Sequence, residues 1–229
     1  MLVAKHSRRK FLWNTGLLIT GLLGSSAISF EFENKKVTLL GDSIRKGYQS
    51  YVGLFLPDNV AIWGPEENTQ HSVHLLANSP RWIKNQPADI IHLNSGLHDI
   101  KNIPYHSRKP LVSAELYAEN IERIIKYIHF CLPECIIIWS TTTPVNDEKA
   151  LATHESTQDF SRYNEDVIKY NEISKKIMQR LGIPVNDLYA FVMKADRKLI
   201  MKDDGVHFTD LGNELLGEQV ANSIRLFIK

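Results

Sequence analysis

Five short apolar runs recur along the chain, and most of them stop at glycine, proline or a polar residue. Apolar residues are largely continuous in these runs instead of alternating with polar ones, which is typical of strands buried on both faces. The runs are KVTLL (36–40), VAIW (60–63), ADIIHLNSG (88–96), CIIIWSTTTP (135–144) and a weaker IPVNDLY (183–189). A sheet made of such strands needs a covering layer on each face.

Helical patterns lie between these runs, at 113–132, 164–182 and 209–228. Ser113, Asn164 and either Thr209 or Asp210 are placed to cap the three helices, and Gly182 stands at the end of the second. Strands that alternate with helices form parallel βαβ units. The sequence therefore predicts an α/β fold, a three-layer α/β/α sandwich with a central parallel sheet of about five strands.

The length and charge of the chain limit what it can be. A chain of 229 residues suits one well-packed domain. The first 29 residues hold four basic and no acidic side chains, so 23 basic and 26 acidic ones remain in the rest. No basic patch alternates with aromatic residues, which argues against a nucleic-acid surface.

The first 29 residues resemble an export signal more than part of a fold. A basic start is followed by an apolar stretch and by small residues, with Ala27 and Ser29 where a signal peptidase cuts. The SRRKFL stretch, with Arg8 and Arg9, resembles the twin-arginine signal of bacteria. The alternative is a membrane anchor, because 11–30 contains no charge. We expect a signal at 1–29, cleaved or retained, a domain at 30–229, and a periplasmic or extracellular location.

Two other segments leave alternatives open. The polar stretch 145–163 follows the fourth strand without clear periodicity, which is typical of a binding loop or lid, or else of disorder. The two cysteines, Cys131 and Cys135, flank the tripeptide LPE. They could pair in an exported protein, but buried thiols at a helix end are the favoured interpretation.

Ser43 stands directly after the first strand, in the sequence LLGDSIRKGY. Ligands of α/β sheets bind at the carboxyl ends of strands, and a helix N-terminus there favours developing negative charge. Gly41, Asp42 and Ser43 are also ordinary turn residues. A nucleophilic serine needs a base and a group that orients the base.

The stretch KDDGVHFTDLG supplies both partners. Asp204 and His207 are three residues apart, just before the last helix, so a turn can place both side chains on one side. The carboxylate would then accept the Nδ1–H bond while Nε2 faces Ser43. Asp203 competes with Asp204 for this role.

Four motifs in this order resemble the SGNH (GDSL) hydrolase superfamily over roughly residues 36–228: GDS, a glycine after the second strand, GxxD after the third, and DxxH before the last helix. The resemblance implies an SGNH-type, flavodoxin-like sandwich. It implies that Ser43 is the nucleophile and that its N–H serves the oxyanion hole together with Gly64. It further implies His207 as the base and Asp204 as the acid that orients it.

The third motif departs from the family pattern. The family has Gly-x-Asn-Asp, whose Asn is an oxyanion donor, whereas this chain has Gly96-Leu97-His98-Asp99. A neutral imidazole has one N–H, so His98 can replace the amide in the oxyanion hole. Two alternatives are that His98 and Asp99 are themselves base and orienting acid, and that His98 is a packed structural histidine.

Weaker candidates complete the predicted site. Asp42, Thr142 and His154 are predicted to bind substrate, although β-propensity explains Thr142 equally well. His71 and His74 have ligand-like spacing, but no third ligand has persuasive spacing, and one helical face at the rim of the site is preferred. No metal and no cofactor are predicted.

We therefore expect an exported serine esterase that works through an acyl-enzyme. Within the family, the GLHD-like third motif points to a carbohydrate O-acetyl esterase. The alternatives are a lipase or lysophospholipase, a catalytically weak glycan-binding protein on a hydrolase scaffold, and a metal-dependent phosphoesterase. The expected partner is a small-molecule or glycan ester, with no nucleic acid, and with a membrane only through an uncleaved N-terminal segment.

Overall fold

A computed structural model describes residues 34–84 and 86–228, and its centre is a five-stranded sheet in which every neighbouring pair is parallel. The strand order is β2-β1-β3-β4-β5. The strands are β1 (Lys35–Leu40), β2 (Val60–Trp63), β3 (Ile90–Leu93), β4 (Ile136–Ser140) and β5 (Val185–Asn186). The predicted number and direction of strands are confirmed, and the weak fifth run is indeed the shortest strand.

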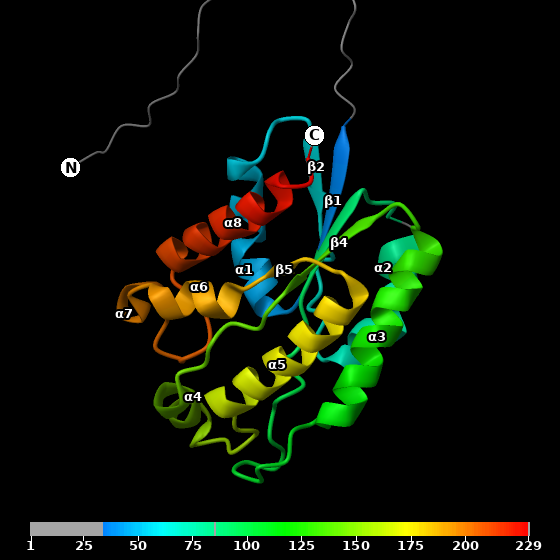
Figure 1. Cartoon of the computed structure of the whole chain (residues 1–229). Coiled ribbons are helices and arrows are strands. Elements are labelled where there is room, and N and C mark those ends of the chain that lie inside the picture. Colours follow the sequence, from blue (N-terminus) through cyan, green and yellow to red (C-terminus); the bar gives the residue numbers. More distant parts are fainter. Residues whose placement is uncertain (1–33, 85, 229) are drawn as a thin grey trace, which may run out of the picture. The chain divides into compact units, whose positions relative to one another are not determined.

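Helices cover both faces of the sheet (Figure 1). One layer contains α1 and α8, which pack on each other, and the other contains α2, α3 and α5. The helices are α1 (Ser43–Val52), η1 (Gly53–Phe55), α2 (Ser72–Lys84), α3 (Ala114–Cys131), α4 (Asp147–His154), α5 (Asn164–Leu181), α6 (Leu188–Lys194), α7 (Arg197–Ile200) and α8 (Asp210–Arg225). The three-layer α/β/α sandwich is confirmed.

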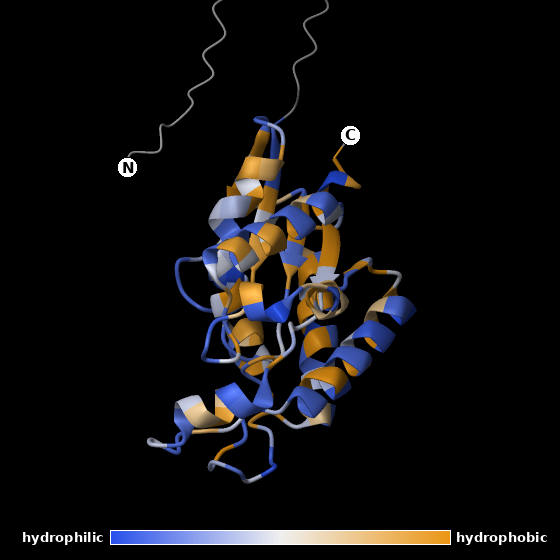
Figure 2. Ribbon diagram, turned by 90° about the vertical axis from the view of Figure 1, so that its left-hand side faces the viewer, coloured by the Kyte–Doolittle hydropathy of each residue, from blue (hydrophilic) through white to orange (hydrophobic). Residues whose placement is uncertain are grey.

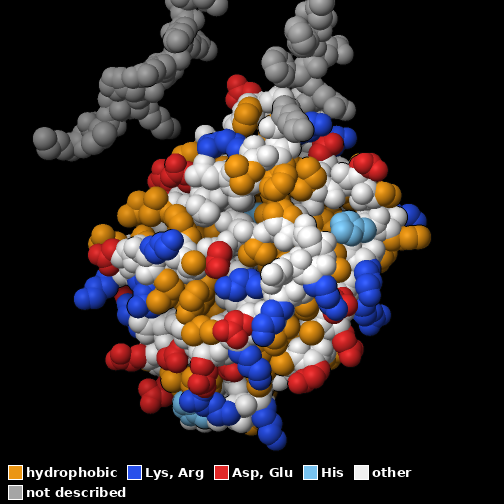
Figure 3. Space-filling view, viewed as in Figure 1, with side chains coloured by type: hydrophobic (Ala, Val, Ile, Leu, Met, Phe, Trp, Pro, Cys, Tyr) orange, Lys and Arg blue, Asp and Glu red, His pale blue; other side chains and the backbone are white. Residues whose placement is uncertain are grey.

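The core lies between these layers. Apolar side chains of β1, β3 and β4 are buried, among them Leu39, Leu93 and Ile137. Figure 2 shows apolar colouring along the strands and hydrophilic colouring on much of the outer helical surface. Acidic and basic side chains are interspersed on the face seen in Figure 3. Continuous apolar runs thus form strands here because both sheet faces are covered.

Two of the three predicted helix caps are present. Ser113 accepts a hydrogen bond from Leu116 N, and Thr209 accepts one from Gly212 N. The prediction for Asn164 is wrong, because this residue is the first of α5 and not its cap. Its side chain bridges two other segments, accepting from Val145 N and donating to Tyr189 Oη. Gly182 ends α5 in the left-handed conformation, with φ of 68°.

The polar stretch 145–163 is ordered, which rules out the disorder alternative, and it contains α4. Asn146 caps this helix by accepting from Lys149 N, and Asp147 and Glu148 lie in its first turn. After α4, Ser161 and Asn102 exchange backbone hydrogen bonds of 2.8 and 3.1 Å. The segment is therefore tied to the loop after β3 as well as to the end of β4.

Both cysteines are free thiols. Cys131 ends α3, and Cys135 is buried before β4. Burial raises the pKa of the Cys135 thiol to about 12. The prediction of buried thiols near a helix end is confirmed for Cys135, whereas Cys131 is only half-buried.

The predicted export signal at 1–29 lies outside the described residues. Within 34–84 and 86–228, no helix is both long enough and apolar enough to cross a membrane.

Candidate active site

Ser43 is the first residue of α1 and follows the carboxyl end of β1 after two residues. Asp42 caps this helix, because its Oδ1 accepts a hydrogen bond of 2.9 Å from Ile44 N. The cap starts the helix at the serine, so the Ser43 N–H lies in the first turn, where the helix dipole is positive. The strand and the cap together fix the position of the hydroxyl.

Ser43, His207 and Asp204 form a hydrogen-bonded row. Ser43 Oγ lies 2.8 Å from His207 Nε2, and His207 Nδ1 lies 2.6 Å from Asp204 Oδ2. Burial raises the pKa of Asp204, but hydrogen bonds from the backbone N–H groups of His207 and Val206 and from the His207 ring outweigh burial, so the net shift is downward. An ionised carboxylate only accepts, so Nδ1 carries the proton and Nε2 is free to accept the serine proton.

The turn that joins Asp204 to His207 depends on Gly205. Its φ of 72° is left-handed, and a Cβ there would lie 2.7 Å from Asn146 O and 2.8 Å from Ala150 N. Asn146 N in turn donates to Gly205 O at 2.8 Å. The turn is therefore packed against the beginning of α4.

The structure also decides between the two neighbouring aspartates. The Asp203 side chain is fully exposed and pairs with Lys149 Nζ at 2.7 Å. Asp204, in contrast, faces the imidazole. Only Asp204 is placed to orient His207.

An open pocket of about 370 Å³ lies beside Ser43. Asp204, Val206 and His207 line one part of it. The remaining wall consists of Asn68, His98, Thr153, His154, Phe160 and Arg162. Four of these residues belong to 145–163, so this predicted binding segment does lie beside Ser43.

His98 lies in the pocket wall, in the loop after β3. Burial lowers the pKa of its imidazole to about 3, with smaller contributions from the charges of Lys101 and Arg162. His98 is therefore neutral at ordinary pH and keeps one N–H donor. No hydrogen bond to its ring is found among the residues that the structure describes.

Asp99 does not face His98. Its carboxylate is buried. It accepts one hydrogen bond from Ser72 N, at the beginning of α2, and another from Ser95 Oγ, in the loop after β3. Burial raises its pKa to about 6 despite these bonds. The alternative in which His98 and Asp99 are base and orienting acid is therefore wrong.

Gly64 is not among the residues that line the pocket beside Ser43, contrary to the expectation of an oxyanion donor there. A Cβ on Gly64 would lie near Gln49 Oε1, Leu39 O and Arg45 Nη1. The chain reaches this pocket four residues after Gly64, at Asn68, which lines the wall in place of the glycine.

Asn68 was missed because the sequence pattern directs attention to the glycine immediately after the strand. Its Oδ1 accepts from Gln70 N at 2.7 Å, which leaves the Nδ2 group as a donor. Thr69 N donates to Gly41 O at 3.2 Å, and Arg45 donates to Glu67 O. These bonds tie the Asn68 segment to the turn that carries Ser43.

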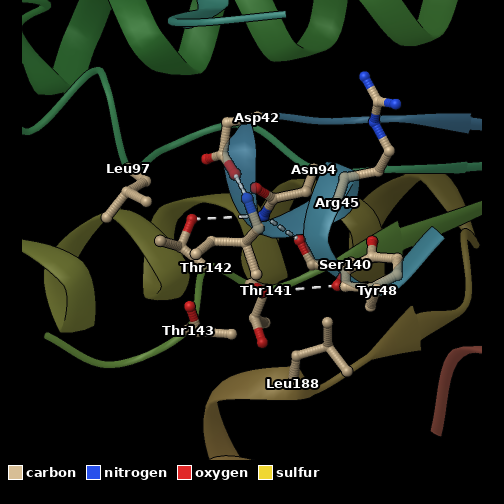
Figure 4. Close-up of a pocket in the computed structure, with 11 residues that line it drawn as sticks. Asp42, Arg45, Tyr48, Asn94, Leu97, Ser140, Thr141, Thr142, Thr143 and Leu188 are labelled. Carbon is tan, nitrogen blue, oxygen red and sulfur yellow. Dashed lines mark hydrogen bonds between the residues drawn. The ribbon is translucent and has the colours of Figure 1, made fainter. Parts of the chain in front are cut away.

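The other predicted substrate contacts divide into two groups. His154 lies in the pocket wall as expected. Asp42 and Thr142 do not, because both are buried and line an enclosed cavity of about 10 Å³ behind α1 (Figure 4). Thr142 N donates to Asn171 Oδ1, so its backbone joins β4 to α5. These two residues have structural roles, and the prediction for them is wrong.

His71 and His74 lie side by side, with ring centres 6.2 Å apart, but only His74 belongs to the helix on which both were predicted. His71 precedes α2, and its Nδ1 accepts from His74 N at 3.2 Å in the first turn. Across the described part of the chain, no group of three or more His, Cys, Asp or Glu side chains is arranged to hold a metal ion.

Two further pocket residues, Phe160 and Arg162, were not found by sequence reasoning. Both belong to the polar stretch after α4, where no motif or periodicity marks them. Backbone pairing of Ser161 with Asn102 brings them to the pocket. Their place in the pocket wall follows from this long-range pairing, for which the sequence carries no local signal.

Known proteins resemble this chain in sequence or in fold. The chain is 25% identical over 124 residues to GDSL esterase/lipase CPRD49 of Arabidopsis thaliana, a match that covers 51% of this chain and 46% of the relative. It thus spans less than half the length of that relative.

Among solved structures, a lipase/acylhydrolase from Enterococcus faecalis superposes with a TM-score of 0.70 at 20% identity, covering 85% of this chain and 97% of the other. An acetyl xylan esterase, AlAXEase, superposes with a TM-score of 0.65 at 19% identity, covering 82% and 99%. At this identity the likeness establishes the fold.

The family assignment comes from the sequence itself. Residues 39–215, which run from the end of β1 into α8, match the GDSL-like Lipase/Acylhydrolase family. The match includes Ser43, Asp204 and His207. The chain therefore belongs to the GDSL-like lipase/acylhydrolase family of ester-bond hydrolases.

Proposed function

We propose that this protein hydrolyses carboxylic esters through an acyl-enzyme formed on Ser43. The observation that carries the proposal is the row of short contacts from Ser43 Oγ to His207 Nε2 and from His207 Nδ1 to Asp204 Oδ2. Ser43 Oγ attacks the ester carbonyl while Nε2 takes its proton, and the imidazolium is stabilised by Asp204. His207 then protonates the leaving alcohol, and a water molecule repeats the cycle on the acyl-enzyme.

The tetrahedral intermediate needs donors for its oxyanion, and the pocket offers three. The Ser43 N–H lies in the first turn of α1, and no acceptor for it is found within the described residues. The Asn68 Nδ2 group and the His98 ring N–H come from two other loops of the pocket wall. We assign the oxyanion hole to these three groups, with Asn68 in place of Gly64.

His98→Ala is expected to lower kcat by about 10²-fold to 10³-fold, the usual effect of losing one oxyanion donor. His98→Asn restores an N–H donor and is expected to recover most of this loss. Because burial holds the pKa of His98 near 3, the shape of the pH–rate profile between pH 5 and 8 is expected to be the same in His98→Asn and the unchanged protein. Steady-state kinetics on an acetyl ester measures both effects.

The control is His129→Ala, at an exposed position of α3. An unchanged rate in His98→Ala would show that His98 is a structural residue. Equal losses in the alanine and asparagine variants would also contradict the donor role.

We further propose that the substrate is an O-acetylated carbohydrate. Eight of the ten residues that line the pocket are polar or charged, and Asn68, His154 and Arg162 carry groups able to bind sugar hydroxyl groups. A solved acetyl xylan esterase has the same fold, which is compatible with this substrate.

If the substrate is an O-acetyl ester, kcat/KM in an acyl-chain series on one alcohol is expected to be highest for the acetyl ester and to fall at least about tenfold by octanoyl. The measurement compares acetyl, butyryl and octanoyl esters and an acetylated xylo-oligosaccharide. A preference for octanoyl would favour the lipase alternative and leave the esterase proposal intact.

Export by a bacterium remains part of this proposal. It rests on the arginine pair, the uncharged stretch and the small residues within 1–29. A carbohydrate substrate outside the cytoplasm is consistent with such a signal.

A further inference from the structure

We propose that the pocket selects esters that carry a negative charge close to the scissile bond, and that Arg162 is the residue that binds this charge. The inference rests on the proposed esterase function and names the chemical class of its substrate. It is carried by a buried cation in the pocket wall whose charge no described residue pairs with.

Arg162 is 7% exposed and lines the pocket together with Ser43. Its Nε donates to Leu97 O at 2.9 Å, which fixes the plane of the guanidinium beside the His98 loop. No carboxylate lies within 4.0 Å of it among residues 34–84 and 86–228. Its two Nη groups make no hydrogen bond to a described residue, and they are not sealed from solvent.

The nearest acids attract Arg162 without forming an ion pair with it. Asp42 and Asp204 attract Arg162 electrostatically, but neither lies within 4.0 Å of its guanidinium. Asp42 caps α1 through Oδ1, and its buried Oδ2 has no hydrogen-bond partner among the described residues. Both oxygens of Asp204 accept hydrogen bonds from the turn and from His207. Burial lowers the pKa of Arg162 to about 10, so the group stays charged at neutral pH. A buried charge is unfavourable unless it is paired and hydrogen-bonded, and a substrate anion would supply the missing partner.

A second cation reinforces the first. Both cations lie close to the Phe160 ring: Lys101 Nζ is 4.4 Å and Arg162 Cζ is 4.6 Å from its centre. The centre of the His154 ring lies 3.9 Å from the centre of the same Phe160 ring. Lys101 likewise has no acidic partner within 4.0 Å in the part of the chain described. Two like charges that share one aromatic ring repel each other, and an anion bound between them and Ser43 would relieve this repulsion.

The planar guanidinium matches a carboxylate or similar anion, since two parallel N–H groups can donate to two oxygens. The anion can belong to the alcohol half or to the acyl half of the ester. Two substrate pairs separate these sources. The first is an O-acetylated galacturonate and its methyl ester, and the second is a monosuccinyl ester and its methyl-capped form.

The unchanged protein is expected to hydrolyse the charged member of at least one pair with a kcat/KM about 10-fold to 100-fold higher than that of its neutral partner, the range expected for a desolvated charge-assisted contact. Each pair differs in charge with little difference in shape. Arg162→Gln is expected to remove most of this preference, and Arg162→Lys to retain part of it. Raised salt is expected to weaken the preference only modestly, because the pair is buried.

Two further variants complete the test. Arg123→Gln, at an exposed position of α3, is the matched control and is expected to keep the full preference. Lys101→Gln changes a half-buried residue and serves as a second probe if Arg162→Gln does not fold, with an expected partial loss of preference.

The outcomes separate the two proposals. Ser43-dependent hydrolysis with equal kcat/KM within both substrate pairs would overturn charge selection alone. An equal loss on charged and neutral substrates in Arg162→Gln would also overturn it, since Arg162 would then act on the ester carbonyl or on the fold. Hydrolysis that persists in Ser43→Ala would overturn the esterase proposal and this inference with it.

Discussion

Ser43→Ala is expected to lower kcat on acetyl esters by about 10⁴-fold or more, with a thermal unfolding midpoint close to that of the unchanged protein. The hydroxyl removed is the group that lies 2.8 Å from His207 Nε2. Without it no acyl-enzyme forms, and only the oxyanion donors and substrate binding remain to accelerate attack by water. Ser43 is partly exposed, so the loss of its oxygen leaves no buried cavity.

The matched control is Ser50→Ala, at an exposed position of the same helix. Kinetics should be combined with labelling by a fluorophosphonate, which forms an adduct with an activated serine. We expect the adduct at Ser43 in the unchanged protein and in Ser50→Ala, but not in Ser43→Ala. Absence of any adduct, together with glycan binding, would favour the binding-protein alternative.

Asp204→Asn is expected to lower kcat by about 10⁴-fold while leaving KM nearly unchanged. The expected loss of activity follows from the different partners of the two carboxylate oxygens of Asp204. One oxygen accepts from Val206 N and His207 N, and an asparagine would keep its carbonyl oxygen there. Its NH₂ group would then face His207 Nδ1, which must become the acceptor. The proton moves to Nε2, which can no longer accept from Ser43.

Asp203→Asn provides the control at the neighbouring position. Its carboxylate is exposed and contacts Lys149, so this change is expected to alter kcat less than about twofold. A comparable loss in both variants would show that charge near the turn matters more than the tautomer of His207. An unaffected rate in Asp204→Asn would contradict the orienting role.

The location of the candidate nucleophile and base follows from local sequence signals that the fold preserves. A glycine, an aspartate and a serine after an apolar run place Ser43 at a strand end and helix start whatever the detailed packing. Asp204 and His207 are three residues apart in a turn, so their contact is a local property. The sheet then brings the two regions together, since β1 and the loop before α8 meet at its carboxyl edge.

Predictions failed where a side chain had more than one compatible environment. Asp42 and Thr142 stand at strand ends, as binding residues do, but Asp42 caps a helix and Thr142 joins β4 to α5. Asn164 has a residue type that is typical of helix caps, yet it bridges Val145 and Tyr189. The choice between such uses depends on which polar groups burial leaves unsatisfied, and that is settled only by packing.

The sequence alone determined the order of the five strands, three of the helices, the parallel sheet and the local Asp204–His207 pair, because hydrophobic periodicity and short turns act over a few residues. The contact of His207 with Ser43 spans 164 residues, and the resemblance to a known family predicted it where no local pattern could. Tertiary structure decided the rest of the pocket. Asn68 lines the pocket where Gly64 was expected, because its neighbours Thr69 and Glu67 bond to Gly41 and Arg45. Arg162 enters the wall because Ser161 pairs with Asn102. These contacts join residues far apart in the chain, and no local pattern encodes them.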